Sequence, residues 1–463
     1  MWTRRQVLAH GGAALAMLGL PRAAAAGSDR AAAIEARPGK VQLAPEGFPA
    51  TEIWGYDGAM PGPELRLRQG ERLRRDFLNN LPQSSSIHWH GIRIDNAMDG
   101  AAGLTQDPVE PGTRFAYDFV APDAGTYWYH AHMRSVEQVG RGLYGALIVE
   151  EADAPDVDRE EVLILDDWML NPETAQIEPT LDSSHDRSHG GQQGNYVATN
   201  GQGALTIDVK RGERLRLRLI NAANSRIFAL GLLGLKGWTL ALDGMPLPAP
   251  EPLDEVLVLG PGQRADLVVD VVADEGEEAH LVRYERREGL SQVAFRVAGA
   301  AVRAERGTPA ALPPNPGMEP PALADAVQAR LNMEGGAMGS LQAAILDGKR
   351  TSFRDMVSRN QFWSFNGRVG MPEEPLVAVE RGQSVRLSVG NDTAFAHAMH
   401  LHGMHFREVA GDAATGPLRD TLMIMPGETR DIAFVADNPG DWLFHCHMLA
   451  HAASGMTTWL KVT

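Results

Sequence analysis

The chain has 463 residues, which is too long for one ordinary hydrophobic core and indicates two or three domains. Hydrophobic residues make up 44% and charged residues 22%, as in soluble globular proteins. The formal net charge of −16 argues against nucleic acid as a partner, because nucleic-acid-binding proteins present basic surfaces. The single cysteine, Cys446, excludes a disulfide within the chain.

The N-terminal segment 1–26 has the composition of an export signal. Arg4 and Arg5 precede a short apolar run over 13–20, and small residues follow it. The arginine pair resembles the twin-arginine signal, which the twin-arginine export machinery reads on folded proteins. The apolar run is too short to span a membrane, and no later segment reaches ~18 apolar residues. We therefore expect an exported, periplasmic protein whose mature chain starts near Gly27.

Two strand motifs recur three times along the rest of the chain, in the same order. The first is a strand, a basic residue with glycine, and an alternating strand that ends in asparagine; it occupies 67–79, 209–221 and 379–391. The second is Pro-Gly followed by an alternating strand; it occupies 111–119, 261–269 and 426–434. This threefold repetition predicts three copies of one β-sandwich domain.

Two stretches of polar or proline-rich sequence mark the expected domain boundaries. The stretch 152–159 is polar, and the stretch 308–321 is rich in proline and predicts an extended linker. The segment 323–346 has a helical composition that Gly335 and Gly336 interrupt, so we interpret it as part of a long connection. The expected units are a first domain over 27–152, a middle domain over 153–305, a linker over 306–350 and a third domain over 351–463.

Ten of the fifteen histidines fall in four short clusters. The clusters are His88-Trp89-His90, His130-Ala131-His132, His397 with His400 and His402, and His445-Cys446-His447 with His451 and Met456 after it. Each contains a His-X-His pair on a predicted strand, and alternation directs both histidines of a pair to one face. One such pair alone would favour a satisfied surface or core pair. Four pairs supply eight imidazoles, which suits a site of several copper ions.

Cys446 points away from the histidines on either side of it, because side chains alternate along a strand. It therefore faces a different metal from theirs. A thiolate, two histidines and a weak axial methionine form the blue-copper electron-transfer set, and His397, His451 and Met456 can complete that set. A structural zinc site fits poorly, since such a site usually takes more than one cysteine.

The motifs resemble those of the multicopper oxidases, which include laccases and bacterial copper efflux oxidases. The likeness runs from about residue 50 to the C-terminus and includes the four clusters and the stretches 125–132, 142–146 and 261–266. It implies an all-β fold of three cupredoxin-like Greek-key β-sandwich domains with four copper ions, one type 1, one type 2 and a type 3 pair. The implied ligands are His397, Cys446, His451 and axial Met456 for type 1, His88 and His400 for type 2, and His90, His130, His132, His402, His445 and His447 for type 3.

The resemblance also implies the reaction, which is one-electron oxidation of a small reducing substrate near His451 or His397, coupled to the reduction of O2 to water. Electrons would pass through Cys446 to a trinuclear site between the first and third domains, and the middle domain would be a spacer. Asp99 matches an acid of the relatives and is a candidate catalytic proton donor; an Asp-Gly turn residue is the alternative. Many bacterial relatives carry Glu where this chain has Ala452.

The substrate class stays open. Four methionines precede the third-domain strands, namely Met318, Met333, Met338 and Met356. They are too sparse for the methionine-rich Cu(I) insert of the efflux oxidases. This favours phenols or aromatic amines, with a cuprous or manganous metallo-oxidase as the alternative and a copper-free envelope scaffold as a distant one. His185 and His189 could bind a metal, although a solvated loop is the favoured interpretation.

Overall fold

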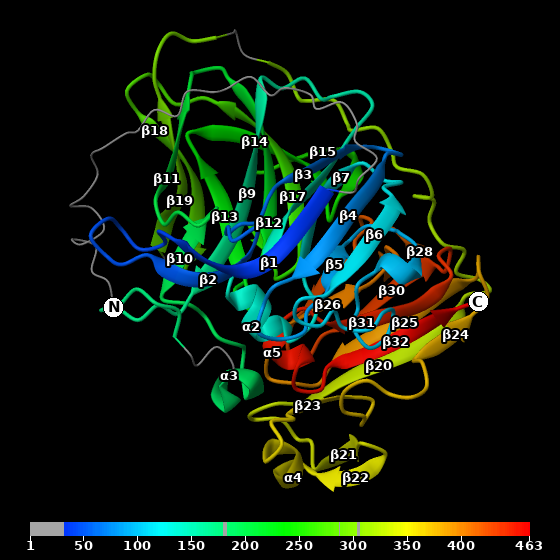
Figure 1. The fold of residues 1–463 in the computed structure, drawn as a ribbon. Coiled ribbons are helices and arrows are strands. Elements are labelled where there is room, and N and C mark those ends of the chain that lie inside the picture. Colours follow the sequence, from blue (N-terminus) through cyan, green and yellow to red (C-terminus); the bar gives the residue numbers. More distant parts are fainter. Residues whose placement is uncertain (1–31, 179–182, 287, 303–305) are drawn as a thin grey trace.

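The computed structural model describes residues 32–178, 183–286, 288–302 and 306–463. The export signal predicted over 1–26 lies outside these residues. The described part of the chain consists mostly of strands, which form paired sheets in three successive units (Figure 1). Within the described ranges, no helix is long and apolar enough to cross a lipid bilayer.

The first unit packs a sheet of order β2-β1-β4-β6 against a sheet of order β3-β8-β7-β5. Its strands are β1 (Ala32–Val41), β2 (Thr51–Tyr56), β3 (Leu65–Arg68), β4 (Arg72–Asn79), β5 (Ile87–His90), β6 (Arg114–Val120), β7 (Gly125–Ala131) and β8 (Tyr144–Glu150), with a 3-10 turn η1 (Asn96–Met98) and helix α2 (Ser135–Gly140). The core between the sheets is rich in aromatic residues and includes Phe77, Trp89 and Tyr117.

The middle unit packs a sheet of order β10-β9-β12-β17-β14-β15 against one of order β11-β19-β18-β13-β16. Its strands are β9 (Arg159–Trp168), β10 (Tyr196–Thr199), β11 (Leu205–Val209), β12 (Arg214–Asn221), β13 (Phe228–Leu233), β14 (Leu235–Leu242), β15 (Met245–Pro252), β16 (Leu257–Leu259), β17 (Arg264–Val271), β18 (Glu278–Glu285) and β19 (Glu288–Val297). Between β9 and β10 lies the short helix α3 (Ser184–Ser188). Aliphatic residues such as Leu215, Leu217 and Leu267 fill this core.

The third unit packs a sheet of order β23-β20-β25-β30-β27-β28 against one of order β24-β32-β31-β26-β29, with the hairpin β21-β22 beside them. Its strands are β20 (Val327–Gly335), β21 (Ala343–Leu346), β22 (Lys349–Ser352), β23 (Trp363–Phe365), β24 (Val377–Val379), β25 (Ser384–Asn391), β26 (His397–Leu401), β27 (Arg407–Ala410), β28 (Ala413–Ala414), β29 (Thr421–Ile424), β30 (Thr429–Val435), β31 (Gly440–Cys446) and β32 (Thr457–Val462). Helices α4 (Phe353–Val357) and α5 (Leu449–Ala452) complete it. Cys446 and Met456 belong to its core.

The two repeated sequence motifs meet in space in the same way in each unit. The backbone carbonyl of the buried asparagine that ends β4, β12 or β25 accepts a hydrogen bond from the glycine N–H of the Pro-Gly turn that precedes β6, β17 or β30. The three bonds are Gly112 to Asn79 (2.7 Å), Gly262 to Asn221 (3.0 Å) and Gly427 to Asn391 (2.9 Å). All three glycines have φ between 76° and 82°, a conformation that side chains beyond glycine rarely adopt. The repeated sequence motifs therefore form the same hydrogen-bonded turn in each of the three units.

The segment 323–346 corrects one expectation. It was interpreted as a connection with helical composition, but it contains β20, which pairs parallel to β25, and β21. Ala329, Leu331 and Met333 favour helices in isolation. Along β20 they lie on the more buried face and alternate with the more exposed polar residues between them. Pairing with a neighbouring strand outweighs intrinsic propensity, which amounts to less than about 1 kcal/mol per residue.

The polar face of β12 is buried instead of facing solvent. Arg216 and Arg218 lie on the side of the middle unit that contacts the first unit, where both form ion pairs with Asp266 and Glu151. Arg218 also donates to the Thr126 hydroxyl of β7 at 2.9 Å. Charged groups therefore join these two units, since a buried guanidinium needs carboxylate partners.

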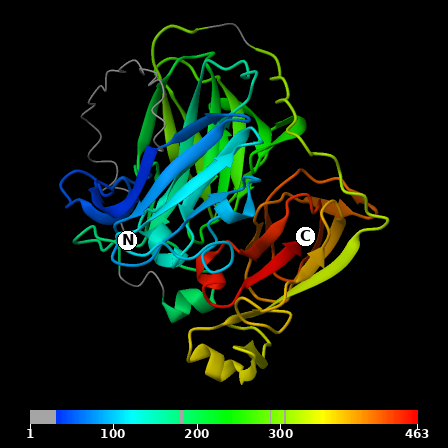
Figure 2. The same cartoon turned by 45° about the vertical axis from the view of Figure 1, so that its right-hand side comes forward.

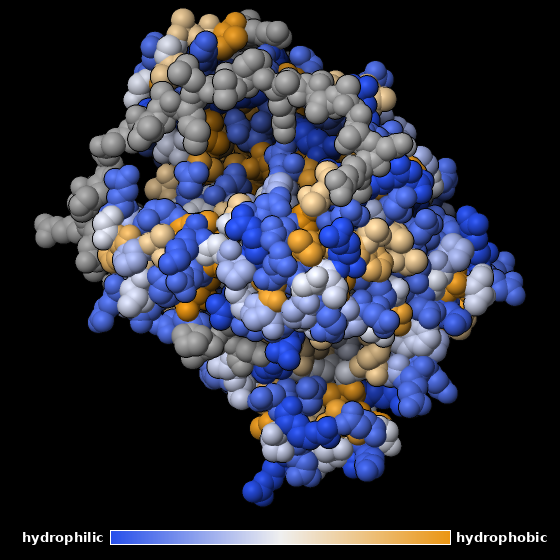
Figure 3. Space-filling model, viewed as in Figure 1, coloured by the Kyte–Doolittle hydropathy of each residue, from blue (hydrophilic) through white to orange (hydrophobic). Residues whose placement is uncertain are grey.

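The first unit lies in the middle of the molecule, with the other two units on either side of it. In Figure 1 the first unit, in blue and cyan, lies between the green middle unit and the yellow-to-red third unit, and the turned view of Figure 2 keeps this order. Helices α2, α3 and α5 come from the three different units, and both α2 and α3 contact α5. The face shown in Figure 3 is mostly hydrophilic, with apolar residues in small groups.

Candidate metal centres

Cross-strand pairing aligns the histidine clusters within each unit. In the first unit, β5 pairs antiparallel with β7 and sets His88 opposite His130. In the third unit, β26 pairs antiparallel with β31 and sets His400 opposite His445. The residues between the histidines, Trp89 among them, face the opposite side and pack into the core, as alternation requires.

Eight imidazoles then meet across the contact between the first and third units. They form three overlapping groups, in each of which the candidate donor atoms lie within 4.8 Å of one another. The groups are His88 with His90 and His130, His88 with His400 and His402, and His132 with His402 and His445. His447 lies beside them, with its ring centre 4.9 Å from that of His90. Two of the three groups mix residues of both units, so docking of the units completes the site.

Several imidazole nitrogens of this site have no hydrogen-bond partner and are available to bind a metal ion. The rings of His130 and His445 use Nδ1 to bond the backbone, at 3.1 Å to the Ala131 carbonyl and 2.9 Å to the Cys446 carbonyl. Buried Nε2 of His130, like Nε2 of His88 and His400, finds no hydrogen-bond partner among the described residues. Burial and neighbouring imidazoles lower the pKa of His445 to about 3, so its ring is neutral, and its Nε2 lies 3.1 Å from Nε2 of His402. A buried nitrogen without a partner is costly unless a cation occupies the space before it.

A second, separate group has the composition of a blue-copper site. The Cys446 sulfur lies 3.6 Å from Nδ1 of His397 and 3.7 Å from Nδ1 of His451, and the two nitrogens are 3.0 Å apart. Met456 is buried in the same core, and its backbone carbonyl accepts the Cys446 N–H. Burial raises the pKa of the Cys446 thiol to about 12, so the thiolate requires a bound cation.

Asp99 is buried at the inner edge of the eight imidazoles and has a partner on each side. Its carboxylate accepts from Nδ1 of His402 at 2.9 Å and lies 3.3 Å from Nδ1 of His88, whose nitrogen also bonds the Asp99 carbonyl at 2.8 Å. Burial opposes ionisation, but His402 and His88 outweigh it and hold the pKa of Asp99 well below its usual range. The carboxylate therefore turns Nε2 of two histidines, one from each unit, toward the shared space.

A second buried carboxylate, Asp420, was missed by the sequence analysis. It lies 3.3 Å from Nε2 of His90 and 3.4 Å from Nδ1 of His400, and its carbonyl accepts from the same His400 nitrogen at 3.0 Å. Arg264 of the middle unit holds it through two bonds, of 2.6 and 2.9 Å. Burial raises the pKa of Asp420, but the guanidinium outweighs burial, so the carboxyl stays ionised. The only signal in the sequence was Arg264 itself, within the family motif 261–266.

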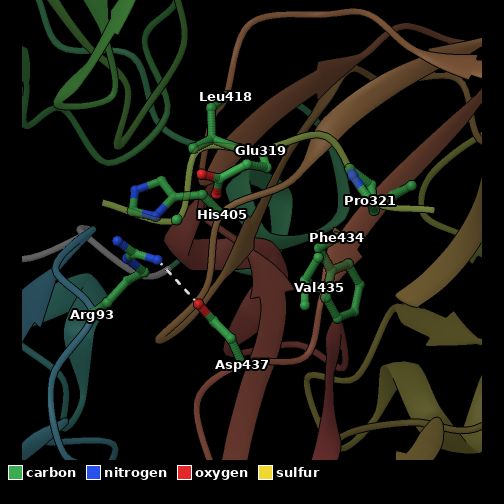
Figure 4. A pocket seen from close by; sticks show the side chains of 10 residues that line it. Arg93, Glu319, Pro321, His405, Leu418, Phe434, Val435 and Asp437 are labelled. Atoms are coloured by element: carbon green, nitrogen blue, oxygen red, sulfur yellow. Dashed lines mark hydrogen bonds and ion pairs between the residues drawn. The ribbon is translucent and has the colours of Figure 1, made fainter. Parts of the chain in front are cut away.

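A small surface pocket reaches toward the same carboxylate. His405 lines it together with Arg93, Glu319 and Asp437, and Figure 4 shows its ring close to the Arg93 side chain. Nε2 of His405 lies 3.7 Å from Asp420, and burial lowers the pKa of His405 to about 4, so the ring is neutral at physiological pH. The residues that line the pocket include His405, next to Asp420, and do not include Cys446, His397 or His451.

The cysteine-centred group has no open edge, which differs from the expectation that a substrate approaches His451 or His397 directly. Both rings are fully buried. Nε2 of His451 donates to the backbone carbonyl of His189 at 2.5 Å, and Nε2 of His397 contacts the Thr393 hydroxyl at 2.8 Å. The sequence offered no dense methionine insert to cover this edge; α3 and the residue after it cover the edge instead.

The fold and these two groups together define a copper oxidase with a cysteine-centred electron acceptor and a histidine cluster of the trinuclear kind. Comparison with known proteins agrees. The family profile described as multicopper oxidase matches residues 38–154, and a second profile with that description matches 348–463. The multicopper oxidase MmcO of Mycobacterium tuberculosis is 30% identical, over 92% of this chain and 86% of its own.

Solved structures show the same relationship. The multi-copper oxidase of Pseudomonas thermotolerans is 33% identical with a TM-score of 0.81, covering 94% of this chain and 99% of its own. Lac15 from a marine microbial metagenome is 41% identical with a TM-score of 0.75, covering 94% of this chain and 100% of its own. The chain belongs to the multicopper oxidase family, and it is a laccase-like oxidoreductase that reduces O2.

The Arg264–Asp420 pair predicts a specific loss on mutation. Asp420→Asn removes the charge that Arg264 pairs with, at a position where both side chains are fully buried. We expect about 3–5 kcal/mol of destabilisation, seen as a lower thermal midpoint of the copper-free protein. Metal analysis should show loss of copper while the cysteine-centred absorption persists. Asp431→Asn, which breaks the half-exposed pair with Arg386, is the control, with an expected cost of about 0–1 kcal/mol; equal effects would contradict a role at the copper site.

Proposed function

We propose that His397, Cys446 and His451 would hold the type 1 copper, with Met456 as a further, weaker ligand. The type 2 copper would be held by His88 and His400, and the type 3 pair by His90, His130, His132, His402, His445 and His447. The observation that supports this division is that one group of donor atoms contains a thiol, whereas three groups contain imidazole nitrogens only and a further group joins His90 and His400 with Asp420. Soft sulfur with two imidazoles suits the electron-transfer copper, and imidazoles alone suit the cluster that meets O2.

The chain itself supplies the path between the two groups. Copper, when bound, supplies the one-electron chemistry and the reduction of O2 to water. Cys446 is joined by peptide bonds to His445 and His447, which lie on the other face of the strand. Nδ1 of His445 also bonds the Cys446 carbonyl at 2.9 Å, which adds a hydrogen-bonded route beside the covalent one. These three consecutive residues would therefore carry the electron from one group to the other.

Replacement of the cysteine should separate the two sites. In Cys446→Ser the hydroxyl is a hard and weakly basic donor, so we expect loss of the blue absorption, loss of oxidase activity and a fall from about four to about three coppers per chain. Visible absorption, metal analysis and O2 consumption measure these effects. Retention of the visible band with normal turnover would show that Cys446 is not a copper ligand.

We propose that Asp99 also serves proton delivery, in addition to orienting histidines. It is the buried carboxylate between His402 and His88. Position 452, where many bacterial relatives carry Glu, is Ala452. A carboxylate in contact with two imidazoles can accept a proton and pass it on, although its low pKa keeps it ionised at rest. An Asp-Gly turn residue would need none of these contacts.

Asp99→Asn tests the proton role. The amide keeps the size of the side chain but cannot carry a proton at neutral pH, so reoxidation of the reduced protein by O2 should slow on the order of 10²-fold. Anaerobic bleaching of the blue absorption should change little, because it requires no proton at this site. Stopped-flow absorption measures the rates of bleaching and of reoxidation in the wild type and in the variant. If reoxidation keeps its rate, the proton donor is another group and Asp99 has an orienting role alone.

For the reducing substrate, we propose that phenols and aromatic amines act as slow outer-sphere donors. The sequence favoured them on the assumption of an open histidine edge, whereas His451 is sealed by the His189 carbonyl. An aromatic ring would have to pass its electron across α3. The alternative is a cuprous or manganous metallo-oxidase; the observation that speaks for it is the presence of two histidines, His185 and His189, on and next to α3.

Phenol oxidation with and without added copper separates these donors. With the purified holoenzyme alone, oxidation of a simple phenol should be slow, and added Cu(II) should raise the rate severalfold because a copper ion bound outside α3 can relay electrons. Spectrophotometric product formation, with a copper-only control lacking enzyme, measures this. If phenol oxidation is fast and its rate does not change when Cu(II) is added, phenols reach the cysteine-centred group directly and the prediction is wrong.

We propose, finally, that the protein is exported through the twin-arginine route and works in the periplasm. The support is the sequence of 1–26 and the need to load copper into a site that only the folded chain assembles. Replacement of Arg4 and Arg5 by lysine should retain the protein in the cytoplasm, as cell fractionation would show.

A further inference from the structure

A buried carboxyl group lies in the contact between the first and middle units. Asp166 of β9 shares a face of that strand with Ile164 and Trp168, because side chains alternate along a strand. Those two residues belong to an apolar cluster that also contains Trp128 and Tyr144 of the first unit. Asp166 is only 3% exposed. Burial of a carboxyl group among apolar side chains costs free energy, so Asp166 does not serve the stability of this contact.

The ionisable groups that act on Asp166 are Tyr144 of β8, Asp167 of β9 and Arg226, which lies between β12 and β13. Arg226 is already paired, with Asp167 and with Glu285, at 2.8 Å each. One oxygen of Asp166 accepts the Asp167 N–H at 2.7 Å, and the other has no hydrogen bond of normal geometry among the described residues. Burial, with the Asp167 carboxylate, therefore raises the pKa of Asp166 well above its usual range. The carboxyl keeps its proton at pH values where an ordinary aspartate has lost it.

Polar groups connect Asp166 to the histidine cluster along one face of the first unit. The Tyr144 hydroxyl interacts with the Asp166 carboxyl, and Tyr144 lies directly opposite His130 on the neighbouring strand β7. Residues in such a pair project to the same face, with Cβ atoms about 4.5–5.5 Å apart. Trp128 shares this face, with its ring centre 4.3 Å from that of His130 and 5.2 Å from that of His90, and its ring N–H has no partner among the described residues.

Asp99 and Asp166 approach different histidines and differ in protonation state. Asp99 contacts His402 and His88, and its low pKa leaves it ionised at rest, so it holds no proton to give. Asp166 reaches toward His130 from the middle unit and carries a proton. Reduction of one O2 to two waters consumes four protons, and a neutral carboxyl group beside the cluster can supply a proton before one arrives from solvent.

We propose that Asp166 is a second proton donor for the reduction of O2 and acts through the Tyr144 hydroxyl. The inference rests on the proposed assignment of His130 to the type 3 pair. In each transfer the O–H bond of the Asp166 carboxyl breaks and its proton passes to the Tyr144 oxygen, while the hydroxyl proton of Tyr144 moves on toward the cluster. Bulk water then returns one proton to Asp166. No electron moves through these residues, and each proton delivered is replaced by one from water.

Infrared difference spectroscopy of the holoenzyme tests the protonation state. The spectrum of the wild type minus that of Asp166→Asn should show the C=O stretching band of a protonated carboxyl group at about pH 6, where an ordinary aspartate is ionised. If this band is missing, Asp166 is ionised and the proposal is wrong. The band does not depend on turnover. A wild type that binds no copper at the histidine cluster would refute the proposed function instead, and the band would still be readable.

Stopped-flow reoxidation of the reduced holoenzyme by O2 tests the transfer. The rate should fall on the order of tenfold in Asp166→Asn and in Tyr144→Phe, and Asp166→Glu should restore most of it because it restores an acid. Tyr129→Phe is the matched control, since the buried Tyr129 hydroxyl donates to the Pro63 carbonyl at 2.6 Å on the other face of β7; it should keep the wild-type rate. Anaerobic bleaching of the blue absorption should be unchanged in all four variants.

The pH dependence of reoxidation separates proton supply from a structural role of Asp166. As the pH rises through the raised pKa of Asp166, the wild type loses this donor, whereas Asp166→Asn has none to lose. The ratio of the wild-type rate to the Asp166→Asn rate should therefore fall toward one at high pH. A ratio of one at every pH shows that no proton leaves through Asp166, and a constant ratio above one shows a structural effect alone; either result overturns the proposal.

Discussion

The structure depends on the burial of imidazole nitrogens that have no partner in the protein. Nε2 of His88, His130 and His400 lies inside the contact between the first and third units without a hydrogen bond among the described residues. Such groups cost about 1–3 kcal/mol each when nothing compensates them. Bound copper would compensate them, so the same atoms that weaken the contact would hold the metal. The docking of the two units and the loading of the cluster are therefore thermodynamically coupled.

The middle unit takes part in this arrangement and is more than a spacer. Arg264 extends from β17 to Asp420 of the third unit and also donates to the Thr126 carbonyl of the first unit at 3.2 Å. Arg218 bonds the hydroxyl of the same Thr126. Buried guanidinium groups hold their geometry only while their carboxylate partners stay in place. The unit without copper ligands thus fixes the relative position of the two units that share the cluster.

Access distinguishes the two copper groups. Peptide bonds and a hydrogen bond link the cysteine-centred group to the cluster, whereas α3, with Trp363 behind it, closes that group off from solvent. The pocket at His405 lies on the side of Asp420 and the cluster.

The sequence by itself determined the local chemistry. Period-two alternation was enough to put both histidines of a pair on one face and Cys446 on the other, because the geometry of a strand depends on the strand alone. The repeated asparagine and Pro-Gly motifs likewise predicted three similar sandwiches. What decided the rest was contact between segments far apart in the chain. β20 became a strand because β25 pairs with it, and Asp420 joined the site because Arg264 reaches it from another unit. The contact of Arg264 with Asp420 and the seal of His189 over His451 leave no periodic signal, since each depends on how folded units dock.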